Sequence, residues 1–252
     1  MESNLYKFCV RLADTSFILS YRLGEYVSHG PFLEEDLSIT NVGLDLIGQA
    51  ESLFKYAAEI KGDGVTADDI AYKREEIEYL NFHLVEYPNE DFAFITVRQF
   101  FMDVYNYHLF TALKNSSDPT ISAVAAKSIK EVNYHLKRSR KWMLRLGDGT
   151  EESHNKIQYA VNELWKYTDE LFDMDDVHKS LIEEGVAFDL KEVEKSWAKD
   201  VEDTLSEATL TKPEHVKHSL VYGKNGGHTD FMGYILTDLQ YLTNRFPDAK
   251  WQ

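Results

Sequence analysis

The chain has 252 residues, and its 43 acidic and 27 basic side chains give a formal net charge of −16. This excess of negative charge argues against nucleic acid or an anionic membrane as the main partner, because both bind basic surfaces. Cys9 is the only cysteine, which excludes a disulfide framework and a cysteine-based zinc or iron–sulfur site. No signal peptide and no membrane-length apolar run is evident, so we expect a cytoplasmic protein that forms one domain over residues 1–252.

Eight segments carry apolar residues at the spacing of an α-helix. In chain order, we expect helices over residues 5–23, 37–60, 67–80, 92–113, 121–146, 153–172, 190–208 and 228–245. Residues 173–188 add one or two helical turns, and residues 84–91 form a loop around Pro88. No segment has the paired strand patterns and turn residues of a β-hairpin. The pattern predicts an all-α protein, a four-helix bundle with additional C-terminal helices.

The breaks between these helices have recognisable residues. Gly30-Pro31 separates the first two long helices, since proline cannot continue a helix. Thr66 or Asp68 is expected to cap the helix that follows, and Pro119 suits a first helical position. The apolar stripe of the second helix consists of Leu37, Leu44, Ile47, Leu53, Phe54, Ala57 and Ile60.

Hairpin geometry brings four acidic residues to the centre of such a bundle. In an antiparallel helix pair, residues equidistant from the turn lie at the same height. Asp14 and Asp45 flank the first turn at nearly equal separation, and Asp103 and Glu131 flank the second turn in the same way. We therefore expect one carboxylate per helix at one level, where di-iron carboxylate bundles hold their metals.

The histidines that a di-iron site requires are missing. Such sites take a Glu-x-x-His pair from each of two helices. Gly48 stands three residues after Asp45, and Tyr134 stands three residues after Glu131, so neither position supplies an imidazole. His135 shares a helix face with Glu131 and is the only histidine placed to contribute. We predict no catalytic, cofactor or metal site, and we interpret these positions as the remnant of one.

The interpretation without metal is that arginine, lysine or tyrosine side chains hold two or three of these buried carboxylates.

Two further features of the sequence have ordinary structural explanations. The basic run from His135 to Arg145 is typical of a solvated helix face, although contact with an acidic partner or a phosphorylated ligand is an alternative. Gly223-Lys-Asn-Gly-Gly-His-Thr resembles a phosphate-binding loop but lacks the Gly-Lys-Ser/Thr ending, so we interpret it as a turn before the last helix. His215 and His218, three residues apart in a predicted loop, are not expected to bind metal.

Several segments in order resemble one known family over nearly the whole chain. They are Arg22-Leu-Gly-Glu-Tyr, Asn41-Val-Gly-Leu-Asp-Leu-Ile-Gly-Gln-Ala, Leu84-Val-Glu-Tyr-Pro-Asn, Ala126-Lys-Ser-Ile-Lys-Glu-Val-Asn-Tyr-His-Leu, Arg145-Leu-Gly-Asp-Gly-Thr-Glu-Glu-Ser, Leu164-Trp, Gly227-His-Thr and Leu239-Gln-Tyr-Leu. The sequence resembles the family of C-type subunits of ring 1,2-phenylacetyl-CoA epoxidases, bacterial multicomponent monooxygenases of phenylacetate degradation.

This resemblance implies a ferritin-like fold and a role as a non-catalytic homologue of the A-type catalytic subunit, which carries the di-iron site. Such a chain would be no enzyme alone, but one component of an assembly that uses O2 and NADPH. The implied partners are the A-type catalytic subunit, the small B-type subunit, and a reductase that carries FAD and an iron–sulfur centre. The chain itself would hold no cofactor and would form a homodimer without its partner.

Two alternatives remain open from the residues. The first is a ferritin-like oxygenase or oxidase that binds metal through Asp45, Asp103, Glu131 and His135. The second is a self-associating bundle unrelated to an oxygenase assembly. Metal analysis distinguishes the first alternative, and co-purification with a partner distinguishes the second.

Overall fold

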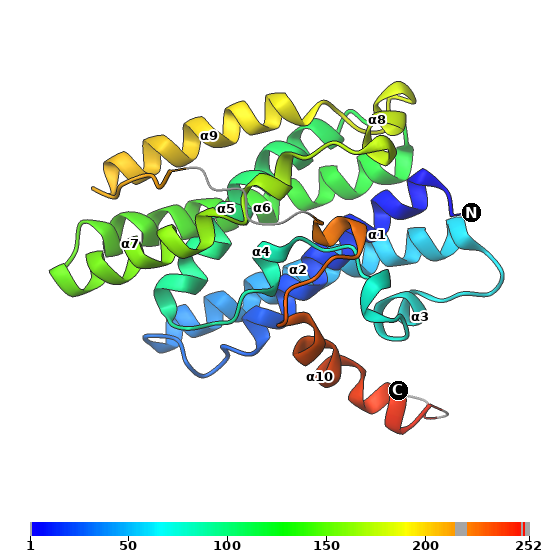
Figure 1. Ribbon diagram of the computed structural model, residues 1–252, viewed down its shortest axis with the longest axis horizontal. Coiled ribbons are helices and arrows are strands. Elements are labelled where there is room, and N and C mark those ends of the chain that lie inside the picture. Colours follow the sequence, from blue (N-terminus) through cyan, green and yellow to red (C-terminus); the bar gives the residue numbers. More distant parts are fainter. Residues whose placement is uncertain (1, 215–220, 248, 250–252) are drawn as a thin grey trace. The chain divides into compact units, whose positions relative to one another are not determined.

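The computed structural model describes residues 2–214, 221–247 and 249, and it is helical throughout (Figure 1). Within these residues there are ten α-helices and three 3-10 helices, and no strand is present. The predicted all-α class is confirmed. No helix in the described part of the chain combines the length and the apolar character needed to cross a membrane.

The four long helices expected for a bundle are all present. They are α1 (Asn4–Gly24), α2 (Leu33–Lys61), α5 (Phe92–Leu113) and α6 (Pro119–Gly147). Side chains at their N-termini explain where three of them begin. Ser3 caps α1 through Tyr6, Asp91 caps α5, and Asp118 caps α6 with Pro119 in its first turn. Each cap satisfies backbone N–H groups that have no partner inside the helix.

The shorter helices differ from the sequence predictions mainly at their ends. They are α3 (Ala67–Tyr72), α4 (His83–Glu86), α7 (Glu151–Trp165), α8 (Asp176–Glu183), α9 (Leu190–Glu207) and α10 (Met232–Arg245), with 3-10 helices η1 (Glu76–Glu78), η2 (Asp169–Phe172) and η3 (Gly223–Asn225). Helix α3 stops at Tyr72 although the apolar pattern continued to residue 80. Residues 84–91, predicted as a loop, begin inside the single turn of α4.

The chain divides into two compact units. Unit 1 takes the described residues of Met1–Val27, Ile39–Pro88 and Leu220–Gln252, and unit 2 takes Ser28–Ser38 and Asn89–Ser219. Unit 1 contains α1, most of α2, α3, α4 and α10. Its core is aromatic where Phe17 of α1 meets Phe54 and Tyr72 edge to face, at ring distances of 5.8 and 5.4 Å.

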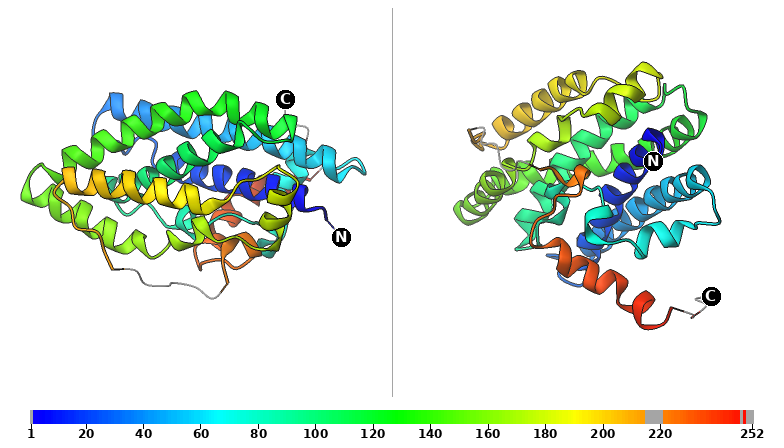
Figure 2. Two further views of the ribbon diagram at one scale, coloured as in Figure 1. Left: turned by 90° about the horizontal axis from the view of Figure 1, so that it is seen from above. Right: turned by 45° about the vertical axis from the view of Figure 1, so that its right-hand side comes forward.

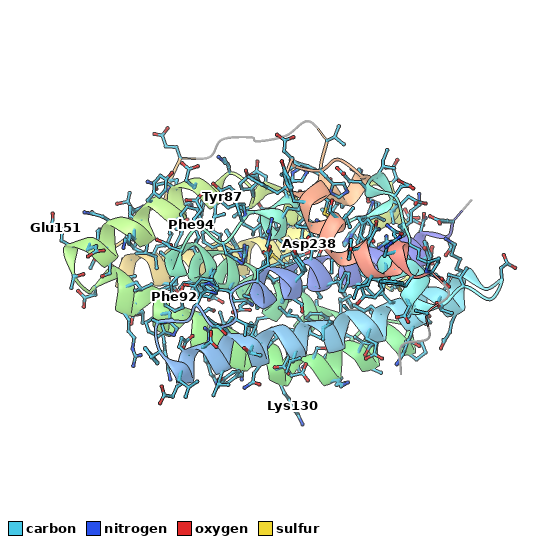
Figure 3. The ribbon with its side chains drawn as sticks, turned by 90° about the horizontal axis from the view of Figure 1, so that it is seen from below. Tyr87, Phe92, Phe94, Lys130, Glu151 and Asp238 are labelled. Carbon is cyan, nitrogen blue, oxygen red and sulfur yellow. The ribbon has the colours of Figure 1, made fainter. Side chains whose placement is uncertain are left out.

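Unit 2 is built around α5, which is buried along most of its length. Helices α6, α7 and α9 all pack against it, and α9 runs alongside α5 and α6 in both views of Figure 2. Phe101 lies 5.7 Å from the rings of both Trp165 and Trp197, and the Trp197 indole N–H donates to the Phe101 carbonyl at 2.9 Å. Phe94, labelled in Figure 3, makes an edge contact with Tyr159 of α7.

The apolar residues of α2 fall on two faces, which corrects the single stripe in the sequence. Leu53, Phe54 and Ala57 are buried, whereas Leu37, Leu44 and Ile47 are 54%, 61% and 41% exposed. Residue spacing explains the difference for Leu37 and Leu44, because positions 37 and 44 lie on the opposite side of a helix from position 53. Leu33, 68% exposed, continues the outward set. We call Leu33, Leu37, Leu44 and Ile47 the α2 outer face.

Candidate functional site

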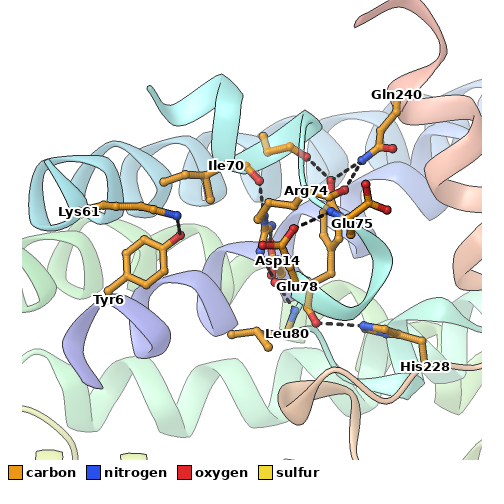
Figure 4. Close-up of polar contacts among 12 residues, drawn as sticks. Tyr6, Asp14, Lys61, Ile70, Arg74, Glu75, Glu78, Leu80, His228 and Gln240 are labelled. Carbon is orange, nitrogen blue, oxygen red and sulfur yellow. Dashed lines mark hydrogen bonds and ion pairs between the residues drawn. The ribbon is translucent and has the colours of Figure 1, made fainter. Parts of the chain in front are cut away.

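Asp14 lies on α1 in unit 1 and is fully buried. Both of its carboxylate oxygens accept hydrogen bonds from the Arg74 guanidinium: Nη1 donates to Oδ2 at 3.0 Å, and Nη2 donates to Oδ1. The backbone N–H of Leu80 donates to Oδ2 at 2.8 Å (Figure 4). A guanidinium therefore occupies the position where a metal-site carboxylate would meet a cation, in the bidentate arrangement that arginine favours.

The end of α3 places Arg74 at this position. The Arg74 Nε donates back to the carbonyl of Ile70, and Nη1 also donates to the carbonyl of Glu78 at 2.7 Å. The guanidinium lies over the Tyr79 ring, 4.1 Å from its centroid. The chain leaves the helix after Tyr72, so α3 is shorter than its apolar pattern and Arg74 lies just beyond its end.

Burial and charge act on this pair in opposite directions. Burial raises the pKa of Asp14, and the Arg74 guanidinium opposes that increase. Burial would lower the pKa of Arg74, but the Asp14 carboxylate outweighs it and the pKa of Arg74 is raised. Arg74 therefore stays charged, and the pair is stable only while both partners are present.

A second buried carboxylate in unit 1, Glu86, was not singled out by the sequence. Its side chain accepts from Asn81 Nδ2 at 2.9 Å, from the Thr229 N–H at 2.8 Å, and from the Thr229 hydroxyl. His228 Nδ1 lies 2.7 Å from Glu86 Oε1, and His228 Nε2 lies 2.9 Å from the Tyr79 carbonyl oxygen. Because both ring nitrogens face acceptors, His228 is held as an imidazolium. Burial would lower its pKa, but these hydrogen bonds raise it.

Asp103 of α5, in unit 2, is also buried but is surrounded by neutral donors. Ser139 Oγ of α6 donates to Oδ2 at 2.7 Å, and Gln99 Nε2 donates to Oδ1 at 2.6 Å. Burial raises the pKa of Asp103 to about 6, and the nearby His135 side chain, with these two hydrogen bonds, limits the increase. His135 itself is 1% exposed.

The remaining predicted positions are less buried. Asp45 and Glu131 are half-buried, and a Cβ built on Gly48 would meet no atom within 4 Å. Tyr134 is 53% exposed on α6, and its hydroxyl lies 3.3 Å from Ser38 Oγ. On the same helix Lys130 projects into solvent (Figure 3). The prediction that the four acidic residues share one level stays a prediction.

Burial shows which pairs on α2 and α6 point inward at i, i+3 spacing. Next to the predicted positions these are Leu46 with Gln49 and Val132 with His135, each at 3% exposure or less. A Glu-x-x-His pair needs its carboxylate at the first of these positions, where this chain has leucine and valine. Sequence reasoning used the neighbouring acids, Asp45 and Glu131, because it could not see which residues face inward.

These residues do not fit a di-iron centre. Among residues 2–214, 221–247 and 249, no three His, Cys, Asp or Glu side chains are arranged to hold a metal ion. Both oxygens of Asp14 are engaged by a cation, and His135 is the one imidazole near Asp103 in the described part of unit 2. His215 and His218 lie outside the described residues.

The basic run of α6 is largely engaged within unit 2. Arg138 donates to the carboxylate of Glu35 and to Ser38 Oγ at 2.9 Å, and burial lowers the pKa of Arg138 to about 10. Arg140 pairs with Glu207, and Arg145 lies over the Trp142 ring at 5.3 Å. These contacts correct the interpretation as a solvated helix face for Arg138, whose side chain is 10% exposed, and they give all three arginines partners within unit 2.

Comparison with known proteins assigns the chain. The model of the phenylacetic acid catabolic protein family matches residues 1–251. The chain belongs to this family. It is also 43% identical over 249 residues to the C subunit of the 1,2-phenylacetyl-CoA epoxidase of Escherichia coli K12, covering 99% of this chain and all of that protein. The family membership and the ferritin-like all-α fold inferred from the sequence are therefore confirmed.

Proposed function

We propose that this protein is a structural, non-catalytic subunit of a multicomponent phenylacetyl-CoA 1,2-epoxidase, which docks onto the di-iron catalytic subunit and supports it. The similarity to the C subunit of such an epoxidase, over 99% of this chain and all of that protein, supports the assignment to such a complex. The assembly acts in aerobic phenylacetate degradation, in the cytoplasm, with O2 and NADPH as co-substrates. The chain itself carries no cofactor, and di-iron, FAD and iron–sulfur groups belong to its partners.

The Asp14–Arg74 pair is the observation that carries the non-catalytic role. A carboxylate that ligates iron must offer its lone pairs to the metal, but Asp14 gives both oxygens to one guanidinium and accepts a backbone N–H as well. A second cation at this position would meet the positive charge of Arg74. Displacement of Arg74 would leave a charged side chain without its partner in the protein interior, which is costly.

The α2 outer face supports the docking role. Leu33, Leu37, Leu44 and Ile47 follow one side of the helix and are exposed. An apolar row on a long helix is typical of interfaces in permanent complexes. We assign it to the A-type catalytic subunit, with the B-type subunit and the reductase joining the assembly, and to a homodimer contact when the catalytic partner is absent.

Co-expression with the catalytic subunit tests this proposal. Wild-type chain is expected to co-purify in a fixed ratio and to be needed for epoxidation, while showing no turnover alone. Leu44→Glu with Ile47→Glu should abolish co-purification, because two charges would be buried at the interface. Tyr234→Glu, at a more exposed position on α10, is the control and should leave the complex intact. Turnover by the isolated chain, or no effect of the double substitution on assembly, would contradict the proposal.

One observation favours the alternative of a metal-dependent oxygenase. His135 is buried on α6 and interacts electrostatically with Asp103 of α5, so a nitrogen and a carboxylate ligand lie close together. The ligand set predicted from the sequence also includes Asp45 and Glu131. Stoichiometric iron that depends on His135 would favour this alternative.

A further inference from the structure

Unit 1 contains a cavity of about 330 Å³ whose lining is unusually basic for this chain. The residues that contribute positive charge come from α1, the end of α2, the segment after α3, and η3. They are Lys7, Arg11, Lys61, Arg74 and Lys224. Acidic residues outnumber basic ones by 43 to 27 in the whole chain, so five basic side chains around one cavity reverse its overall charge balance.

The acidic residues near the cavity do not cancel this charge. Two acidic side chains, Glu2 and Glu78, also line it, and Glu2 pairs with Lys61 at 3.3 Å. Asp14, which does not line the cavity, pairs with Arg74. These three carboxylates are fewer than the five basic side chains that line the cavity. Figure 4 shows this region, with Tyr6 and Lys61 beside the Asp14–Arg74 pair.

The glycine-rich loop singled out in the sequence forms part of this cavity. Lys224 and Asn225 of η3 line it, and Arg11 fixes them by donating to the Lys224 carbonyl at 3.1 Å and to Asn225 Oδ1 at 3.2 Å. Gly226 follows with φ of +79°, and a Cβ there would lie 2.4 Å from the Ile77 carbonyl oxygen. Only glycine fits this approach, so the loop is held against the cavity wall in a defined shape.

Lys7 contributes a positive charge to the cavity that pairs with no other side chain among the described residues. Among the described residues, its ammonium has no ion-pair or hydrogen-bond partner, whereas Lys61 contacts Glu2 and Tyr6 and Arg74 contacts Asp14. A cavity near the lower end of the size range of small-molecule sites, with an uncompensated ammonium and an amide side chain, suits a compact anion.

We propose that this cavity binds a phosphate or diphosphate group, held by Lys7, Arg11 and Lys224 with Asn225 as a neutral donor. Phosphate oxygens accept several charge-assisted hydrogen bonds at once, which matches groups arriving from separate elements. The group belongs either to a free phosphate compound or to a coenzyme that carries phosphates. The proposal rests on the residues of unit 1 and does not depend on the proposed function.

Titration calorimetry of the full-length chain tests the site with inorganic pyrophosphate and, separately, with coenzyme A. We expect saturable 1:1 binding of pyrophosphate that weakens as NaCl concentration rises. Lys7→Gln should weaken it about tenfold, as expected for loss of one charged hydrogen-bond donor. Lys55→Gln is the matched control, because Lys55 is an exposed lysine of α2 that pairs with Glu51 outside the cavity. It should bind as the wild type does.

Competition identifies the source of the phosphate. If coenzyme A displaces pyrophosphate, the group comes from a coenzyme, and if it does not, the natural ligand is a smaller phosphate compound. Absence of saturable pyrophosphate binding overturns the proposal, as does equal weakening by Lys7→Gln and Lys55→Gln. Binding of an acidic peptide that pyrophosphate cannot displace also overturns it and assigns the cavity to a protein segment. Circular dichroism of both variants confirms that they fold.

Discussion

Unit 1 and unit 2 each bury an aspartate on a long helix, and they stabilise it in different ways. Asp14 meets a guanidinium and a backbone N–H, whereas Asp103 meets a hydroxyl and an amide, with an imidazole nearby. Glu86, the second buried carboxylate of unit 1, also has a charged partner, His228. A buried carboxylate can thus be retained as half of an ion pair or as a group poised to take up a proton.

The difference has consequences for stability. In unit 1 the charges hold separate segments together, because α1 is tied to the chain after α3 and α4 is tied to the segment before α10. In unit 2 the ionised form of Asp103 has no full counter-charge and is a net cost at neutral pH. Substitutions at the two sites should therefore change stability with opposite signs.

The largest effect is expected from Arg74→Met, which leaves Asp14 buried without its partner. We predict a loss of about 3–5 kcal/mol in the free energy of unfolding at pH 7, measured by urea denaturation. The loss should shrink at pH 5, because an unpaired buried Asp14 protonates more readily. The double substitution Arg74→Met with Asp14→Asn removes both charges and should recover much of the stability. A loss below about 1 kcal/mol for the single variant would show that the ion pair is not structural.

Asp103→Asn should stabilise the protein at pH 7. The folded-state pKa of Asp103, about 6, is above the ordinary value of 3.8, so the folded form binds more protons between these values. Wild-type stability therefore falls as pH rises through this window. Above pH 6, removing the ionisable group should raise the free energy of unfolding by at most about 3 kcal/mol. Near pH 3.8 the gain should vanish. The Gln99 side chain can turn so that its buried Oε1, which has no partner, accepts from the new amide. Destabilisation at pH 7 would contradict this account.

His228→Gln should lower the free energy of unfolding by about 1–2 kcal/mol at pH 6, because it removes the charged donor to Glu86. The folded-state pKa of His228 is raised, so its contribution is fully present below the unfolded-state pKa of about 6.5 and is lost as pH rises through the folded value. The stability difference between wild type and variant should therefore narrow at alkaline pH. Histidine NMR titration checks the cause directly, and a His228 pKa below that of histidine in an unfolded peptide would refute it.

The smallest effect is expected from Ser139→Ala, a loss of about 1 kcal/mol in the free energy of unfolding at pH 7. The substitution removes one donor to the carboxylate, so it should also move the pKa of Asp103 further upward. Ser128→Ala removes another buried serine hydroxyl of α6 and serves as the control, with no change in the Asp103 pKa. An unchanged Asp103 pKa in Ser139→Ala, followed by carboxyl-carbon NMR, would show that the hydroxyl does not hold the ionised form.

The long helices could be predicted from local patterns, and the partners of the buried charges could not. Helix α5 runs over Phe92–Leu113 as the sequence indicates, and Pro119 begins α6. Arg74 was missed because it lies 60 residues from Asp14 and reaches it only if α3 stops early. His228 and Glu86 are separated by 142 residues and lie on unrelated elements. No spacing rule connects such pairs.

Which face of α2 is buried could also not be predicted from the sequence. Both of its faces carry leucine and isoleucine, so apolar spacing alone does not distinguish a core face from an outward face. The same ambiguity affected α6, where Glu131 and Tyr134 attracted attention although Val132 and His135 face inward. Asp14 and Asp103 were chosen by their distances from the predicted turns, and both are buried, but their role as the remnant of a metal site stays a prediction.

Iron analysis of the purified chain tests the central claim most directly. The wild-type protein is loaded with Fe(II) without oxygen, exposed to air, desalted, and measured by metal analysis and Mössbauer spectroscopy. We expect iron far below one atom per chain and no coupled di-iron spectrum, because the Arg74 guanidinium engages both oxygens of Asp14 and the inward positions of α2 and α6 next to Asp45 and Glu131 lack carboxylates. About two coupled iron atoms per chain, lost on substitution of His135, would contradict it.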